Sequence, residues 1–201
     1  YFLEGTIECG SVFKPFIYAD SIEEGKYDHN AYYNSGSYNV YYGNKLVATI
    51  KDHNGGQGWG TITYDQGLYH SSNVAICNLL DQGYVTKDVL TEKLNDLGFF
   101  QGDTMDGLTC SSSINAYTRK NAGRLEYLTT GFGQGSTVTP YQLLKAYSVF
   151  GNDGKTVQPH IVDKVVNPET NKVVYQATPK YSKQIFSTNT ISQVKDLMLG
   201  V

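Results

Sequence analysis

Near its beginning the chain reads ECGSVFKPF over residues 8–16, and this stretch decides how the rest of the sequence is interpreted. It holds Ser11 and Lys14 in an S-x-x-K arrangement. The residue pattern predicts a helix over 11–24 that ends at Gly25, because glycine is a common helix stop. Residues three apart lie on one face of a helix, so the amine of Lys14 can reach the hydroxyl of Ser11.

This pair suits nucleophilic catalysis. A serine hydroxyl is a poor nucleophile until a base takes its proton. A lysine can act as that base when burial and nearby cationic groups lower its pKa. Ser11 also stands at the start of the predicted helix, where unpaired backbone N–H groups favour a developing oxyanion. The alternative interpretation is a helix cap beside a surface lysine, since Ser and Lys recur three residues apart by chance.

A second motif, S-x-N, occupies Ser71-Ser72-Asn73 between two predicted short helices, Thr63–His70 and Asn73–Gln82. Ser71 could relay a proton, and the amide of Asn73 could orient both the lysine and a substrate amide. Ser and Asn are also good N-caps, so the triplet could instead begin the helix over 73–82. Both roles can hold at once.

The remaining sequence favours an α+β chain. The amphipathic spacing predicts a helix over 86–97, and Thr139-Pro140 predicts the start of a helix over 140–150. Further predicted elements are a hairpin of 38–42 with 46–50, a strand–turn–strand segment over 161–176 and a last helix over 190–199. Residues 99–139 are expected to be rich in loops. Helices followed by a late hairpin indicate α+β rather than a βαβ series.

The composition excludes several classes of protein. Hydrophobic residues make up 40% of the 201 residues, which is enough for the packed core of one domain or a large part of one. The net charge of −3 and the lack of a Lys/Arg stripe argue against a nucleic-acid partner. No apolar run is long enough to cross a bilayer. Cys9, Cys77 and Cys110 are too few for a disulfide framework and include no metal-binding pair, so no metal or other cofactor is expected.

The sequence around both motifs resembles the penicillin-binding proteins. Residues 8–16 resemble the stretch around the nucleophilic serine of that family, and residues 71–75 resemble its second motif. GQG at 133–135, followed by VTPYQL at 138–143, resembles the class B, monofunctional branch. S-x-x-K and S-x-N occur in this family together with a third motif, K-T-G. The resemblance runs over residues 1–201.

The resemblance implies a penicillin-binding protein/serine β-lactamase-like fold, with a central, mostly antiparallel sheet and helices on both faces. It implies a peptidoglycan D,D-transpeptidase at the extracytoplasmic face of the bacterial cell membrane. Ser11 would attack the carbonyl between two terminal D-alanines of a stem peptide, and an amine of a neighbouring stem peptide would resolve the acyl-enzyme. Lys14 would be the base, Ser71 the proton relay and Asn73 the orienting amide, and β-lactams would acylate the same serine. The alternatives are a non-catalytic β-lactam sensor or scaffold of the same fold and a serine β-lactamase.

Two departures from the family pattern stand out. Cys9 occupies a position that is usually proline, and we expect a small buried residue there, with a redox or metal role as the alternative. K-T-G is absent, because Thr129-Thr130-Gly131 lies in a predicted loop and Lys155-Thr156 is followed by valine. We therefore expect residues 1–201 to be a fragment of the transpeptidase domain, truncated at both ends and inactive alone, with the membrane anchor elsewhere in the protein.

The other ionisable residues are assigned no chemistry. The four histidines form no close pair and are interpreted as surface or packing side chains. Glu23 and Glu24, near the predicted end of the first helix, are interpreted as solvated charge.

Overall fold

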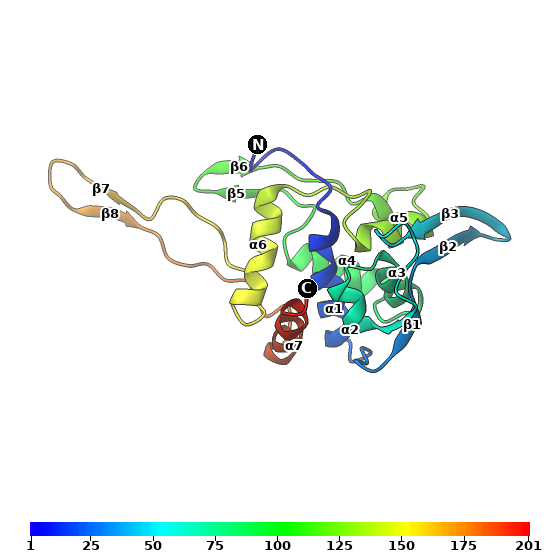
Figure 1. Cartoon of the computed structure of the whole chain (residues 1–201). Helices are drawn as coiled ribbons and strands as arrows, with labels where there is room; N and C mark the ends of the chain where they lie inside the picture. Colours follow the sequence, from blue (N-terminus) through cyan, green and yellow to red (C-terminus); the bar gives the residue numbers. More distant parts are fainter.

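The chain folds into seven α-helices, two short 3-10 helices and eight strands, in a computed structural model that describes residues 1–201. The helices are η1 (Gly10–Phe13), α1 (Lys14–Glu23), α2 (Tyr64–Tyr69), α3 (Asn73–Asp81), α4 (Lys87–Asp96), η2 (Ala116–Thr118), α5 (Arg124–Gly131), α6 (Pro140–Gly151) and α7 (Thr188–Met198). The strands are β1 (Tyr32–Asn34), β2 (Ser37–Tyr42), β3 (Lys45–Lys51), β4 (Thr61–Thr63), β5 (Asp103–Met105), β6 (Leu108–Cys110), β7 (Lys164–Val166) and β8 (Val173–Gln176). Figure 1 shows the helices gathered in the middle, with the hairpins β2–β3 and β7–β8 projecting at opposite ends. None of the helices combines the length and apolar composition needed to cross a bilayer.

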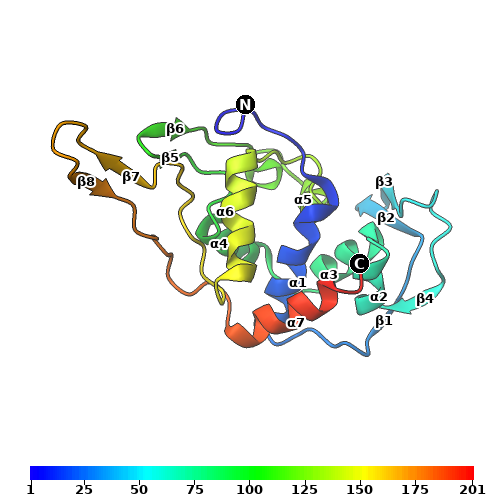
Figure 2. The same cartoon turned by 60° about the vertical axis from the view of Figure 1, so that its left-hand side comes forward.

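Helix α1 is the centre of the hydrophobic core. Every residue from Phe13 to Ile22 is buried, and α1 packs against α3, α4 and α7. Figure 2 shows it between α6 on one side and α2 and α3 on the other. The Phe16 ring contacts those of Phe99, Tyr147 and Phe150, with centroids 5.1 to 5.4 Å apart. A helix surrounded on all sides needs a mainly apolar surface, and residues 13–22 supply one apart from Lys14, Asp20 and Ser21.

The strands pair in four separate antiparallel ladders. These are β1–β4, β2–β3, β5–β6 and β7–β8. The α+β class and the antiparallel pairing are therefore confirmed. Within residues 1–201 no sheet has more than two strands. The core in this part of the fold is consequently made by helices, with the hairpins at its edges.

Side-chain caps begin most of the helices, which is why the sequence predicts them well. Thr63, Ser72, Thr86, Thr139 and Ser187 each accept a hydrogen bond from the backbone N–H three residues on. Helices α2, α3, α4, α6 and α7 all begin within two residues of their predicted starts. The hairpins β2–β3 and β7–β8 are also confirmed.

The expectation that residues 99–139 are rich in loops overlooked one helix, α5. This helix begins at Arg124, and its N-cap residue, Gly123, has no side chain that could accept a hydrogen bond. The carboxylate of Glu126 accepts the N–H of Gly123 instead, at 2.8 Å. Thr129-Thr130-Gly131 therefore lies in the last turn of α5 rather than in a loop.

The interpretation of Glu23 as solvated charge is also wrong. Its carboxylate accepts hydrogen bonds from the N–H and hydroxyl of Ser187, both at 3.0 Å, and from the hydroxyl of Thr190. A carboxylate is favoured there because the first N–H groups of a helix have no partner within it. Glu23 thus joins the end of α1 to the start of α7.

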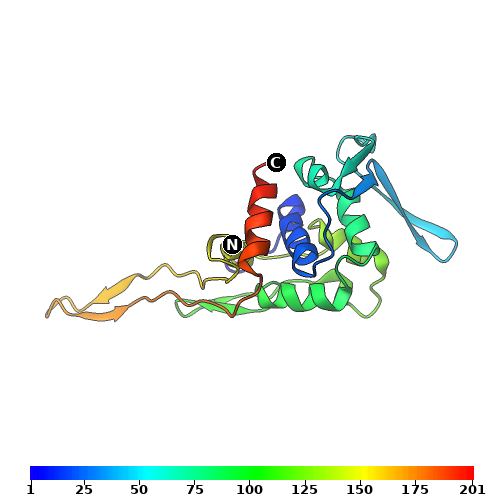
Figure 3. The same ribbon diagram turned by 90° about the horizontal axis from the view of Figure 1, so that it is seen from below.

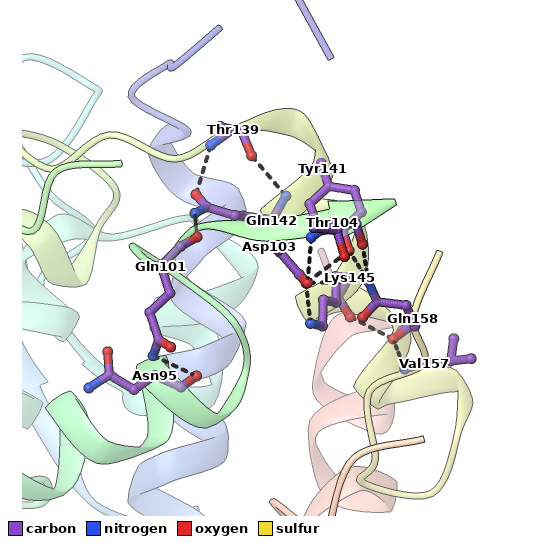
Figure 4. Close-up of polar contacts among 11 residues, drawn as sticks. Asn95, Gln101, Asp103, Thr104, Thr139, Tyr141, Gln142, Lys145, Val157 and Gln158 are labelled. Carbon is purple, nitrogen blue, oxygen red and sulfur yellow. Dashed lines mark hydrogen bonds and ion pairs between the residues drawn. The ribbon is translucent and has the colours of Figure 1, made fainter. Parts of the chain in front are cut away.

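A polar network fastens β5 to α6 (Figure 4). The carboxylate of Asp103 accepts hydrogen bonds from Lys145 Nζ at 2.6 Å and from the hydroxyl of Tyr141 at 2.9 Å. The amide of Gln158 donates to the carbonyl of Thr104 and to the hydroxyl of Tyr141, both at 2.6 Å. Because these groups satisfy one another, the network serves to hold the β5–β6 hairpin and the segment after α6.

Candidate active site

The S-x-x-K motif spans the change from a 3-10 turn to an α-helix. Ser11 is in η1, and Lys14 is the first residue of α1. Ser11 is exposed, whereas Lys14 is 1% exposed. The motif thus presents a hydroxyl at the surface and an amine inside the core.

Three contacts from distant residues hold the turn that carries Ser11. The N–H of Gly10 donates to the carbonyl of Gly133 at 2.9 Å, and the N–H of Gly135 donates to the carboxylate of Glu8 at 3.0 Å. The hydroxyl of Tyr147 donates to the carbonyl of Val12. The first contact requires glycine, because a Cβ on Gly133 would lie 2.2 Å from the carbonyl oxygen of Gly10. This close approach explains why the first residue of the GQG motif, Gly133, must be glycine.

Lys14 connects the two sequence motifs. Its Nζ donates to the hydroxyl of Ser71 at 3.0 Å and to the carbonyl of the same residue. Ser11, Lys14 and Ser71 line one pocket of about 280 Å³. The pocket is also lined by Val12, Pro15, Leu68, Tyr147, Met198 and Val201. It therefore brings two hydroxyls and one amine together within mostly apolar walls.

Burial lowers the pKa of Lys14 from 10.5 to about 8, because the charged form loses its hydration. The Asp52 carboxylate and the Cys77 thiol act in the opposite direction and favour the ammonium form. An amine with a pKa near 8 is neutral often enough at physiological pH to accept a proton, and it can return that proton. The direction of this shift is the one that a lysine base requires.

Ser71 adopts a backbone conformation that normally selects glycine. Its φ is +52°, and it follows the last turn of α2. The N–H of Ser71 donates to Leu68 O and the N–H of Ser72 donates to Gly67 O, each at 2.8 Å. These two bonds form a Schellman motif, in which glycine usually takes the left-handed position. A serine in this conformation costs of order 1 kcal/mol of backbone strain. The same conformation places its carbonyl and hydroxyl in contact with Lys14.

Asn73 lies at the first position of α3, and its amide is engaged elsewhere. The Nδ2 group donates to the carbonyl of Lys51 at 3.0 Å. The contacts of Lys14 are made with Ser71 and do not include Asn73. Of the four site residues predicted from the sequence, the structure gathers Ser11, Lys14 and Ser71 in one pocket. It places Asn73 two residues after Ser71, at the first position of α3 and outside the residues that line the pocket.

Cys9 packs against the edge of the core beside the nucleophile's turn. Burial raises the pKa of its thiol to about 11, which disfavours the thiolate that metal binding and redox chemistry require. No group of three or more His, Cys, Asp or Glu side chains in the chain could hold a metal ion.

Two residues of the site were missed by the sequence reasoning. Tyr147 contacts the turn of Ser11 from α6, and the buried carboxylate of Asp52 contacts the start of α3. No local pattern marks either residue, because each acts on a segment far away in the chain. The only available signal for Asp52 is an acidic residue at the end of a predicted strand.

Comparison with known proteins finds one matching family and several relatives. The family model described as the penicillin binding protein transpeptidase domain matches residues 1–201. Stage V sporulation protein D of Bacillus subtilis is 30% identical over 192 residues, which are 94% of this chain and 28% of that protein. The peptidoglycan D,D-transpeptidase FtsI homolog of Mesostigma viride is 25% identical over 179 residues, covering 83% of this chain and 28% of that protein. This chain thus spans about a quarter of the length of these two relatives.

The fold has close matches among solved structures. Penicillin-binding protein A from M. tuberculosis, solved as an imipenem acyl-enzyme complex, superimposes with a TM-score of 0.85 at 17% identity. The match covers 99% of this chain and 44% of that one. The arrangement of helices and hairpins described above is therefore a known one.

Proposed function

Because the chain belongs to the penicillin-binding protein transpeptidase family, we propose that it is part of a peptidoglycan D,D-transpeptidase with Ser11 as its nucleophile. The substrate would be a stem peptide that ends in two D-alanines. The names of the relatives support this activity, since one of them is a peptidoglycan D,D-transpeptidase. The alternatives with the same fold, a sensor or a β-lactamase, have no observation here that favours them.

The proposed reaction begins when neutral Lys14 takes the proton of the Ser11 hydroxyl. The oxygen of Ser11 then forms a bond to the carbonyl carbon between the two D-alanines, and the carbonyl oxygen becomes an oxyanion. The N–H of Ser11 lies at a helix start, where it has no partner within the helix, and it can stabilise that charge. Collapse of the intermediate breaks the peptide bond, and the proton returns to the leaving D-alanine through Lys14 and Ser71. A second amine then attacks the acyl-enzyme by the same steps in reverse.

The observation that carries this proposal is the contact between the two motifs. A buried lysine with a pKa near 8 is held by the hydroxyl and carbonyl of Ser71 in the pocket that Ser11 lines. A structural lysine on a helix surface would have neither the burial nor the lowered pKa. Asn73, at the start of α3, would orient the substrate amide through its Oδ1, because its Nδ2 group donates to Lys51 O.

Other parts of the proposal concern the rest of the protein. We propose that the K-T-G strand and a membrane anchor belong to parts of the protein outside residues 1–201, and that the enzyme acts at the extracytoplasmic face of the cell membrane. The coverage of the relatives supports this, because the matched segment is about a quarter of their length. β-Lactams would bind covalently at Ser11.

The test is covalent labelling of the full protein with a fluorescent penicillin, followed by peptide mapping. We expect Ser11→Ala to abolish the label, while Ser37→Ala, an exposed serine of β2, leaves it unchanged. Lys14→Arg keeps the positive charge but cannot release a proton, so acylation should slow by several orders of magnitude. Label that persists in Ser11→Ala, or that maps to Ser71, would refute the assignment.

A further inference from the structure

The turn that carries Ser11 is held only weakly by its own helix. η1 has four residues, and no side chain caps its start. Pro15 has no N–H that could donate to the carbonyl of Ser11, so the N–H of Lys14 donates to that carbonyl instead. Gly10 precedes Ser11, and glycine loses more conformational freedom on folding than any other residue. The position of the Ser11 hydroxyl therefore depends on contacts from other elements.

One of these contacts comes from a side chain of α6, which lies beside α1 (Figure 2). The hydroxyl of Tyr147 donates to the carbonyl of Val12, the residue directly after Ser11, at 2.5 Å. In the other two contacts the donors are backbone N–H groups, those of Gly10 and Gly135. Tyr147 is thus the one donor of the three that a substitution can remove without changing the backbone.

We propose that Tyr147 is a positioning residue for Ser11, which it holds in place for attack through the carbonyl of Val12. None of the sequence motifs assigns this role to Tyr147. Its hydroxyl is directed at the backbone of the turn, so it acts through Ser11 and not on the reacting atoms. The proposal rests on the proposed function, because a rate of attack has a meaning only if Ser11 is acylated.

The first argument is that Tyr147 is itself fixed. Its ring packs edge-on against the rings of Phe16 and Phe150, with centroids 5.1 and 5.6 Å away. Both phenylalanines are buried in the core cluster. A donor anchored in the core can restrain a surface turn that lacks support of its own.

The second argument is that Tyr147 remains a donor throughout the pH range in which the lysine base works. Burial raises the pKa of the Tyr147 hydroxyl to about 12, and the thiol of Cys9 acts in the same direction. Lys14 changes its charge near pH 8, well below that value. The pH profile of acylation should therefore follow Lys14 whether or not the hydroxyl of Tyr147 is present.

The test is Tyr147→Phe in the full protein, acylated by a fluorescent penicillin. Rapid mixing separates the dissociation constant of the first, non-covalent complex from the limiting rate of acylation. The ring still lines the pocket, so the dissociation constant and the midpoint of the pH profile should be unchanged. The limiting rate should fall by about 10-fold, since a misplacement near 1 Å can cost about 10²-fold.

Cys9→Pro provides a rescue, because it stiffens the same turn from the other side. The φ of Cys9 is −82°, close to the value that proline imposes, and its N–H donates to no backbone carbonyl. Proline restricts the backbone without any contact from Tyr147. The double variant should therefore recover most of the rate that Tyr147→Phe loses, with Cys9→Pro alone as its reference.

Hydrogen exchange of residues 9–17, followed by mass spectrometry, reports on the turn independently of acylation. Exchange should be faster in Tyr147→Phe and slower again in the double variant. The matched control is Tyr127→Phe, since Tyr127 is also half-buried and its hydroxyl donates to a backbone carbonyl, that of Val85, at 3.2 Å. A merely structural role predicts that both variants lower the melting temperature and leave the acylation rate and this exchange unchanged.

Two results would overturn the proposal. One is a Tyr147→Phe protein with the limiting rate of the unmodified protein, whatever its melting temperature. The other is a lowered rate with unchanged exchange in residues 9–17, which would mean that the hydroxyl acts on the substrate directly. If the unmodified protein is not acylated at Ser11, the proposed function fails, and the hydrogen exchange of Tyr147→Phe still decides whether Tyr147 holds the turn.

Discussion

The two long hairpins of the molecule, β2–β3 and β7–β8, are built alike and anchored differently. Both are antiparallel pairs with one register shift. In β2–β3, Val40 and Ile50 are buried in the core cluster at 1% and 8% exposure, and the hairpin packs on α3. In β7–β8 every strand residue is exposed, and Val174 reaches 64%. Figure 3 shows the second hairpin extended away from the helices.

The difference shows what local sequence determines and what it does not. Alternating strand residues around a turn predict both hairpins equally well. Anchoring depends on side chains outside the hairpin: Asp52 at its base, and Arg124 of α5 on its flank. The base of β7–β8 is also contacted from outside, because the carboxylate of Asp106 accepts the N–H groups of Ile161 and Val162, but neither strand buries a side chain in the core. We therefore expect substitutions in β2–β3 to affect both the active site and the global stability. Equivalent substitutions in β7–β8 should affect only the hairpin itself.

The largest expected effect comes from removing the apolar anchor of β2–β3. Ile50→Ala deletes a buried side chain of the core, and such changes cost about 2–4 kcal/mol of unfolding free energy. For a chain of this size, the melting temperature should fall by about 4–15 °C. The matched change in the other hairpin, Val174→Ala, should stay within about 0.5 kcal/mol. Urea denaturation of the full chain measures both losses of unfolding free energy. Equal losses at the two positions would show that the two hairpins are anchored equally.

The contrast between local and long-range contacts also explains which parts of the structure the sequence predicts. Helices with a Ser or Thr cap and an apolar stripe were predicted almost to the residue, because both signals are local. Helix α5 was missed, since its cap is a glycine backbone paired with Glu126 and its last turn, Thr-Thr-Gly, has low helix propensity. Glu23 was misjudged because its partners on α7 are 164 residues away.

The candidate site divides in the same way. Ser11 and Lys14 were singled out by their spacing together with the family resemblance, whereas the contact of Lys14 with Ser71 was not predicted and is made by the fold. The carboxylate of Asp52 carries no spacing signal, because it meets α3 through the fold. The amide of Asn73 is the converse case: its motif suggested a contact with the lysine, and the loop geometry turns it to Lys51 instead.

A smaller effect should come from the polar anchor on the flank of β2–β3. The guanidinium of Arg124 donates to both carboxylate oxygens of Asp81 on α3 and to the hydroxyl of Tyr38 at 3.0 Å. Arg124→Lys keeps the charge and loses the two-pronged geometry, so the unfolding free energy should fall by about 0.5–1 kcal/mol. The isolated surface pair of Lys183 with Asp96, at 2.9 Å, provides the control, and Lys183→Ala should shift the urea midpoint less. A larger shift for Lys183→Ala would mean that the flank contact does not anchor the hairpin.

The smallest effect is a pH dependence of the unfolding free energy that comes from His29. This residue connects α2 to α7 through Asp65 and Gln193. Its Nε2 lies 3.0 Å from Gln193 Oε1 and its Nδ1 lies 3.0 Å from Asp65 Oδ1. Both neighbours are acceptors, so the ring holds both contacts best when each nitrogen carries a proton, and the pKa of His29 is raised by Gln193 first and by Asp65 next.

A raised pKa means that the folded state binds the proton more tightly than the unfolded state. The stabilisation is therefore complete below the unfolded pKa of about 6.5 and is lost as the pH rises through the folded value. The ring is 42% exposed, so solvent screening should keep the contribution below about 1 kcal/mol.

Urea denaturation of the full chain at steps from pH 5.5 to 8.5 should show the unfolding free energy declining across this window, and His29→Gln should flatten that decline. Gln193→Ala removes the largest cause of the raised pKa and keeps Asp65, so it should leave part of the slope. A decline of the same size in His29→Gln would show that another group sets the pH dependence, and the contact between α2 and α7 would then add nothing to the anchoring at this end.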